Sequence, residues 1–93
     1  MVSGTKMLEK DIEKKCNEWA EKRGWWQRKF VSPNQRGVPD RLYIRDGKVV
    51  FVEFKKPGSK PTALQVKTIN EMYAHGATVH VIDNLEDFKL LMG

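Results

Sequence analysis

The dipeptide Asp46-Gly47 constrains the fold of this chain more than any other feature, because it lies between two short runs rich in β-branched and aromatic residues. A two-residue type I′ turn requires positive φ at both central positions, and Asp-Gly is among the sequences that adopt this turn most readily. The pattern therefore predicts an antiparallel β-hairpin in which Arg45 pairs with Lys48 across the turn.

The same register brings two carboxylates together at the open end of the hairpin. Counting outward from the turn places Asp40 opposite Glu53, and facing residues of an antiparallel pair have Cβ atoms roughly 5 Å apart. Lys55 follows Glu53 by two residues and therefore points to the same side of the sheet. This side also carries four apolar residues that we expect to be buried, namely Leu42, Ile44, Val49 and Phe51. The two carboxylates are then expected at the rim of a buried surface.

A carboxylate pair in this position needs a cationic partner, because buried unpaired charges are costly and like charges repel. Mg²⁺ is typically held by one or two carboxylates, several waters and substrate phosphate oxygens. Asp40, Glu53 and the backbone carbonyl of Phe54 could supply the protein's share of such a site, with Lys55 assisting the hydrolysis of a phosphodiester. The alternative is a purely structural salt bridge between Glu53 and Lys55.

The remaining pattern predicts one small α/β domain over residues 6–93, preceded by a flexible N-terminus over residues 1–5. Helices are expected over 6–23, from a capping box of Thr62 and Gln65 to Gly76, and from Asn84 onward. Strands are expected over 25–31, in the hairpin and over 77–82. A helical crossover makes the third and fourth strands parallel, so the αβββαβα order gives a small mixed β-sheet flanked by helices.

Basic residues are concentrated around the two carboxylates. The formal net charge of the chain is +5, and residues 22–60 hold eleven basic and three acidic side chains. Such a stripe suits a polyanion such as DNA, and the alternative is a solvated basic surface without a partner. The residues expected to contact DNA phosphates are Arg28, Lys29, Arg36, Arg41, Lys56 and Lys60.

A single cysteine, Cys16, excludes an internal disulfide framework and favours a reducing, intracellular compartment. No run of apolar residues approaches the length that spans a membrane, so no membrane partner is expected. The tryptophans Trp19, Trp25 and Trp26 are expected mainly in the core, although an exposed one could anchor a contact between subunits.

Two motifs together resemble those of a known family. The first is Gly37-Val38-Pro39-Asp40-Arg41, and the second is Phe51-Val52-Glu53-Phe54-Lys55 followed by Pro57-Gly58. They resemble the signature of the VRR-NUC (virus-type replication-repair nuclease) family within the PD-(D/E)xK nuclease superfamily. The leading helix with Glu9 to Glu13 and the later Leu64-Gln65 fit the same arrangement, so the resemblance covers nearly the whole chain. It implies a restriction-endonuclease-like αβββαβ core, which the patterns predict independently.

The resemblance also implies roles for individual residues. Asp40 and Glu53 match the family's metal ligands, and Lys55 matches its catalytic lysine. Gln65 matches the family's glutamine, in addition to its place in the capping box. A further acidic residue from the first helix is expected at the site, for which Glu9 and Glu13 are both candidates.

The function that the resemblance implies is a Mg²⁺- or Mn²⁺-dependent DNA endonuclease similar to Holliday-junction resolvases. Such an enzyme is expected to act as a homodimer on branched DNA in the cytoplasm of a bacterial or phage-infected cell. Two other functions stay open. The chain could be a nucleic-acid-binding module with weak catalysis, or a dimerisation module of a DNA repair complex.

Overall fold

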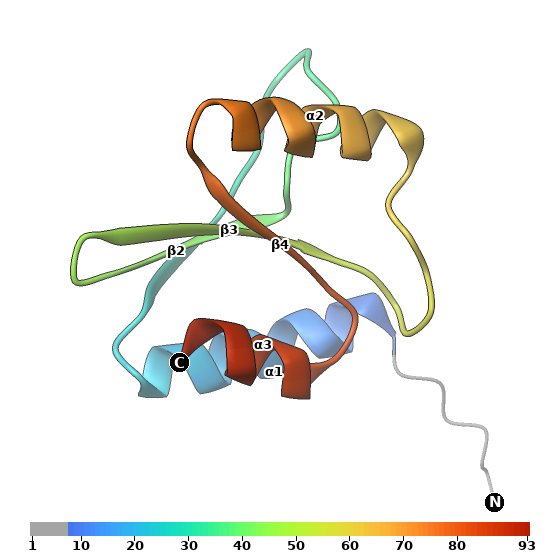
Figure 1. The fold of residues 1–93 in the computed structure, drawn as a ribbon. Coiled ribbons are helices and arrows are strands. Elements are labelled where there is room, and N and C mark those ends of the chain that lie inside the picture. The colour runs from blue at the N-terminus through green and yellow to red at the C-terminus, as the bar shows by residue number, and fades with distance from the viewer. Residues whose placement is uncertain (1–7) are drawn as a thin grey trace, which may run out of the picture.

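The structure is a computed structural model that describes residues 8–93. Its described part has the predicted αβββαβα order (Figure 1). The helices are α1 (Glu9–Lys22), α2 (Ala63–Ala74) and α3 (Leu85–Met92), and the strands are β1 (Trp26–Lys29), β2 (Arg41–Arg45), β3 (Lys48–Phe54) and β4 (Thr78–Ile82). The predicted flexible segment 1–5 lies outside the described residues. Residues 6 and 7 of the predicted first helix also lie outside the described residues, and α1 begins at Glu9, after the extended backbone of Leu8.

The four strands form one mixed sheet in the order β1-β2-β3-β4. Strands β3 and β4 are parallel and the other neighbours are antiparallel, as predicted. Arg45 pairs with Lys48, so the hairpin register is confirmed. The φ angles of Asp46 and Gly47 are 52° and 78°, which are the positive values that a type I′ turn requires.

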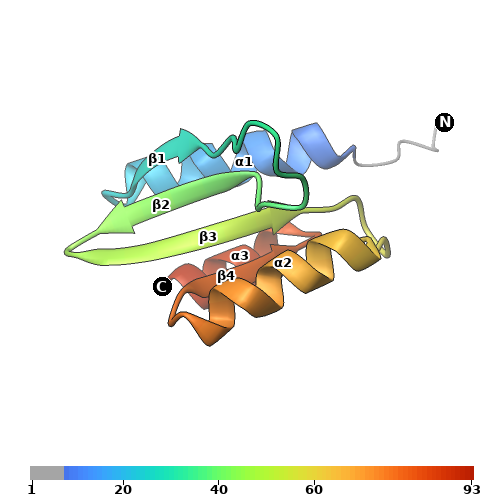
Figure 2. The same ribbon diagram turned by 90° about the horizontal axis from the view of Figure 1, so that it is seen from above.

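Helices cover the two faces of the sheet unequally. Helix α2 lies on one face, whereas α1 and α3 lie together on the other (Figure 1). Seen from above, α2 runs along the β3–β4 side of the sheet, while β1 and β2 extend beyond it (Figure 2). The sheet is therefore fully covered only on the side of α1 and α3.

The main core lies between the sheet and the pair α1 and α3. Its sheet residues are Tyr43, Val50, Val52 and Phe54, all at most 1% exposed, and Phe88 and Ile12 pack against them from the helices. The prediction that the opposite side, with Leu42, Ile44, Val49 and Phe51, would be buried is confirmed only in part. Leu42, Ile44 and Phe51 are half-buried and Val49 is exposed, because α2 does not reach across that side of the hairpin.

Local signals at the helix ends act as predicted. Gln65 Oε1 accepts a hydrogen bond from the Thr62 amide at 2.8 Å, and Thr62 Oγ1 accepts one from the Gln65 amide at 3.2 Å. Helix α2 ends at Ala74, and Gly76 follows with a φ of 89°. No helix in the described range 8–93 is long and apolar enough to cross a membrane.

The aromatic residues divide between core and surface. Trp25 is buried, Trp19 is half-buried with its ring edge against Phe88, and Trp26 is 48% exposed. Two of the three tryptophans thus belong to the core, as expected, and Trp26 is the exposed one. Cys16 is fully buried on α1, as expected for a core residue.

Candidate active site

Glu53 lies near the end of β3. Among the described residues it is the charged side chain that is buried, with 2% of its surface exposed. Gln65 Nε2 on α2 donates a hydrogen bond to Glu53 Oε2 at 2.8 Å, and Lys55 Nζ lies 3.3 Å from the same oxygen. The second oxygen, Oε1, is also buried and has no hydrogen-bond partner among the described residues. Gln65 thus forms the predicted capping box and also contacts the Glu53 carboxylate.

Asp40 lies immediately before β2 at the same end of the hairpin. Its Oδ2 atom accepts a hydrogen bond from the Phe54 amide at 2.8 Å. The N–H and C=O groups of one strand residue point to the same neighbour, so the Phe54 carbonyl also faces the side on which Asp40 lies. The structure therefore brings Asp40, Glu53, Lys55 and the backbone of Phe54 to one end of the sheet, as the register predicted.

The electrostatics of these residues reflect two carboxylates held close together away from water. Burial and the charge of Asp40 raise the pKa of Glu53 to about 7, against the lowering effect of Lys55. Burial also raises the pKa of Asp40, although the hydrogen bond from the Phe54 amide lowers it. A cation placed between the two carboxylates would relieve both effects.

The two acidic candidates on α1 are placed differently. The Glu13 carboxylate forms an ion pair with the Arg41 guanidinium. Glu9 is exposed, and its pKa is raised by partial burial and by the charge of Asp40. Over residues 8–93 no three His, Cys, Asp or Glu side chains form a group that could hold a metal ion. Neither Glu9 nor Glu13 therefore completes a third carboxylate ligand in this structure.

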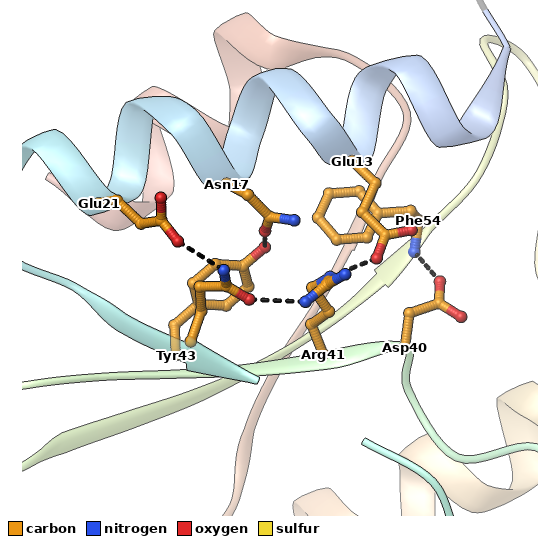
Figure 3. A network of polar contacts seen from close by, with 8 residues as sticks. Glu13, Asn17, Glu21, Asp40, Arg41, Tyr43 and Phe54 are labelled. Carbon is orange, nitrogen blue, oxygen red and sulfur yellow. Dashed lines mark hydrogen bonds and ion pairs between the residues drawn. The ribbon is translucent and has the colours of Figure 1, made fainter. Parts of the chain in front are cut away.

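A network of side chains fixes α1 against the hairpin beside the site (Figure 3). Asn17 accepts a hydrogen bond from the Tyr43 hydroxyl at 2.5 Å, and Glu21 accepts one from Gln27 at 2.7 Å. Arg41 donates to Gln27 at 2.6 Å and also pairs with Glu13. Sequence reasoning did not find this network, although the spacing of Glu13, Asn17 and Glu21, four residues apart on one helix face, was a usable signal.

The predicted DNA-contacting residues fall into distinct groups. The Arg41 side chain is 21% exposed and is engaged with Glu13, so it differs from the expected open phosphate contact. The Arg28 guanidinium stacks on the Trp26 ring at 4.4 Å from its centre. The remaining four, Lys29, Arg36, Lys56 and Lys60, are exposed near the site end of the sheet or on the loops that leave it.

Comparisons with known proteins agree with the fold. No family model matches the chain. A protein named "Putative nuclease p44", from Acyrthosiphon pisum secondary endosymbiont phage 1, is 46% identical over 84 residues, which are 89% of this chain and 90% of that protein. A solved structure described as "VRR_NUC domain" matches with a TM-score of 0.83 and 28% identity, covering 90% of this chain and 92% of that one.

A mixed sheet between helices, with Asp40, Glu53 and Lys55 at the end of its hairpin, defines a nuclease of the restriction-endonuclease-like fold. Within this class, the comparisons cover nearly the whole chain and nearly the whole of both related proteins. The chain belongs to the VRR-NUC family of nucleases.

Proposed function

We propose that this protein is a metal-dependent DNA endonuclease that acts on branched DNA, such as four-way junctions, as a homodimer. The observation that carries the proposal is the Glu53 carboxylate, which is buried, unpaired at Oε1 and 3.3 Å from the Lys55 ammonium at Oε2. A buried oxygen without a hydrogen-bond partner lowers the stability of the fold by about 1–3 kcal/mol or more. Such an oxygen therefore indicates a site where a ligand or an ion binds.

The residues present fit a hard divalent cation. Oxygen ligands are what Mg²⁺ and Mn²⁺ prefer, and these ions commonly take one or two carboxylates while water and substrate phosphate fill the other positions. Glu53 Oε1, the Asp40 carboxylate and the Phe54 carbonyl would hold the ion.

Each neighbouring side chain has a distinct task in phosphodiester hydrolysis. A bound divalent ion would supply positive charge for the phosphate and lower the pKa of a water molecule. Gln65 holds the Glu53 carboxylate in place through its hydrogen bond to Oε2, and the Phe54 amide does the same for Asp40. Lys55 Nζ can donate a hydrogen bond to a phosphate oxygen or orient the attacking water.

The proposal is tested by cleavage of an immobile four-way junction and of a linear duplex, each with Mg²⁺, with Mn²⁺ and with chelator. We expect cleavage only with metal, and faster on the junction. Asp40→Asn should slow cleavage by at least about 100-fold, because it weakens the metal site without changing side-chain size. Asp46→Asn, at the exposed turn of the same hairpin, is the matched control and should cleave like the wild type. Cleavage in chelator, or full activity of Asp40→Asn, would contradict the proposal.

The uncovered part of the sheet supports the homodimer. Trp26 and Val49 are 48% and 41% exposed, and they share the α2 side of the hairpin with the half-buried Leu42, Ile44 and Phe51. Contiguous apolar surface of this kind commonly marks a contact between proteins. A two-fold dimer also places two active sites on one DNA junction, which needs two nicks.

Sedimentation of the free protein tests the dimer. We expect the wild type to sediment as a dimer and Trp26→Lys to sediment as a monomer. Leu90→Lys is the control, because Leu90 is 82% exposed on α3, in the opposite layer of the fold. A monomeric wild type would remove the dimer proposal, and a dimeric Trp26→Lys would remove the proposed contact surface; either result leaves the nuclease proposal in place.

A further inference from the structure

A groove of about 330 Å³ lies beside the candidate active site, between α1 and strands β1 and β2. Residues from both sides line it: Lys10, Glu13, Lys14, Asn17, Glu18, Lys29 and Arg41. Figure 3 looks at the inner part of this region, where Glu13, Asn17 and Arg41 bridge the helix and the hairpin. The groove is thus formed by the same network that fixes α1 to the sheet.

The charge of the groove is unbalanced. Glu13 and Arg41 neutralise each other in their ion pair. Lys10, Lys14 and Lys29 have no carboxylate within ion-pair distance among the described residues, and the one other acidic group in the lining is Glu18. Three ammonium groups around one concave surface repel one another and lower the free energy of an anion bound there. Lys10 and Lys14 lie four residues apart on α1, and Lys29 lies on β1 across the groove. The three ammonium groups therefore line the groove from two sides.

The groove adjoins the site rather than lying elsewhere on the domain. Arg41, in its wall, directly follows Asp40 in the sequence. Lys29 pairs with Arg41 in the sheet, and the amide of the next residue, Phe30, donates a hydrogen bond to the Asp40 carbonyl at 2.8 Å, so Lys29 lies at the same end of the hairpin as Asp40. When the scissile phosphate of a nucleic acid lies at Asp40 and Glu53, the neighbouring phosphates of its backbone therefore lie next to these lysines.

We propose that this groove is a subsite for the nucleic-acid backbone, in which Lys10, Lys14 and Lys29 bind phosphates next to the one that is cleaved. The substrate strand then crosses the site from the α1 side and leaves over the loop that carries Lys56 and Lys60. This inference rests on the proposed function and deepens it, since it states the path of the substrate. Lys10 and Lys14 were absent from the basic residues that the sequence singled out, because they lie outside the basic stripe of residues 22–60.

The test is the salt dependence of DNA binding, measured by anisotropy of a labelled DNA duplex in chelator, where no cleavage occurs. Each phosphate contact contributes about 0.9 to the slope of log affinity against log salt. Lys10→Gln/Lys14→Gln should lower this slope by about two, and Lys29→Gln from the opposite wall by about one. All three side chains are exposed, so folding of the variants is expected and is checked by circular dichroism.

The matched control is Lys15→Gln/Lys22→Gln, which removes the same charge from the same helix. Both lysines are exposed, and neither lines the groove. The control should leave the slope unchanged. Equal decreases in both double variants, or no decrease in Lys10→Gln/Lys14→Gln, would overturn the subsite. Inorganic phosphate at millimolar concentration is a second probe, and it should compete with DNA more strongly on the wild type than on Lys10→Gln/Lys14→Gln. Equal competition on both proteins would also overturn the subsite.

Failure of the subsite is distinguishable from failure of the proposed function. If the wild type cleaves DNA with Mn²⁺ while the groove variant keeps the wild-type slope, the subsite is wrong and the nuclease proposal stands. If the wild type neither binds nor cleaves DNA, both proposals fall.

Discussion

Replacing Glu53 by glutamine should stabilise the metal-free protein in a pH-dependent way. The pKa of this carboxyl is raised from its ordinary value of 4.5 to about 7 by burial and by Asp40. The folded state therefore binds the Glu53 proton more tightly than the unfolded state does. Its contribution to stability is complete below pH 4.5 and is lost as the pH rises through 7. Glu53→Gln has no proton to lose and escapes this destabilisation.

The magnitude follows from the shift. Each pKa unit corresponds to 1.36 kcal/mol, so the wild type should lose about 3 kcal/mol of unfolding free energy between pH 4.5 and pH 8 through this one group. The glutamine still accepts from Gln65 with its oxygen, but its amide replaces the unpaired Oε1 atom with an unpaired donor. The cost of this unpaired amide is the same at every pH. The pH dependence of the difference in unfolding free energy between Glu53→Gln and the wild type therefore reports the Glu53 carboxylate alone.

The assay is urea unfolding of both proteins in chelator across this pH range. We expect the stability of Glu53→Gln relative to the wild type to rise by about 3 kcal/mol from pH 4.5 to pH 8. Glu71→Gln, an exposed carboxylate on α2, is the control and should track the wild type. Saturating Mn²⁺ at pH 8 should stabilise the wild type and leave Glu53→Gln unchanged. A difference that stays constant with pH would refute the described environment of Glu53.

Three further predictions follow from the same geometry. Lys55→Ala should lose most cleavage activity yet keep Mn²⁺ binding by calorimetry, because the proposed role of Lys55 is to contact the substrate phosphate and not the metal; loss of metal affinity together with activity would make its salt bridge with Glu53 mainly structural. Gly37→Ala should lower stability by about 2–3 kcal/mol in urea unfolding, since the glycine has a φ of 91° and a Cβ there would lie 2.8 Å from a side chain of α2. Gly58→Ala, with a φ of 81° and nothing within 4 Å of the added Cβ, should cost only about 1–2 kcal/mol, and equal losses would contradict the steric argument. Neutralising Lys56 and Lys60 should lower the salt slope of DNA binding by about two, and an unchanged slope would move the DNA path away from this loop.

Local sequence was enough to predict the hairpin and the place of its carboxylates. Asp46-Gly47 permits the positive φ angles of a type I′ turn, and a two-residue turn leaves one register for the strands that it joins. From that register, the pairing of Asp40 with the end of β3 follows by counting. The Thr62–Gln65 capping box and the end of α2 are equally local, because their hydrogen bonds join residues at most four apart.

Which side of the sheet became the core was decided only by tertiary packing. Both sides of the hairpin carry apolar residues, so alternation identifies two candidate faces and does not choose between them. The choice depends on α1 and α3 covering the side of Tyr43 and Phe54, and on α2 leaving the side of Val49 open. Burial depends on residues that are distant in the sequence.

The finer structure of the site has the same origin. Four-residue spacing made Glu9 and Glu13 equivalent in the sequence, but the ion pair with Arg41 engages Glu13, whereas Glu9 stays exposed. Gln65 reaches Glu53 because α2 packs beside the end of β3. The sequence by itself therefore determined which residues meet at the open end of the hairpin, through short-range backbone geometry. The tertiary structure decided which partners hold them and which oxygen stays free, because those contacts join elements that only long-range packing brings together.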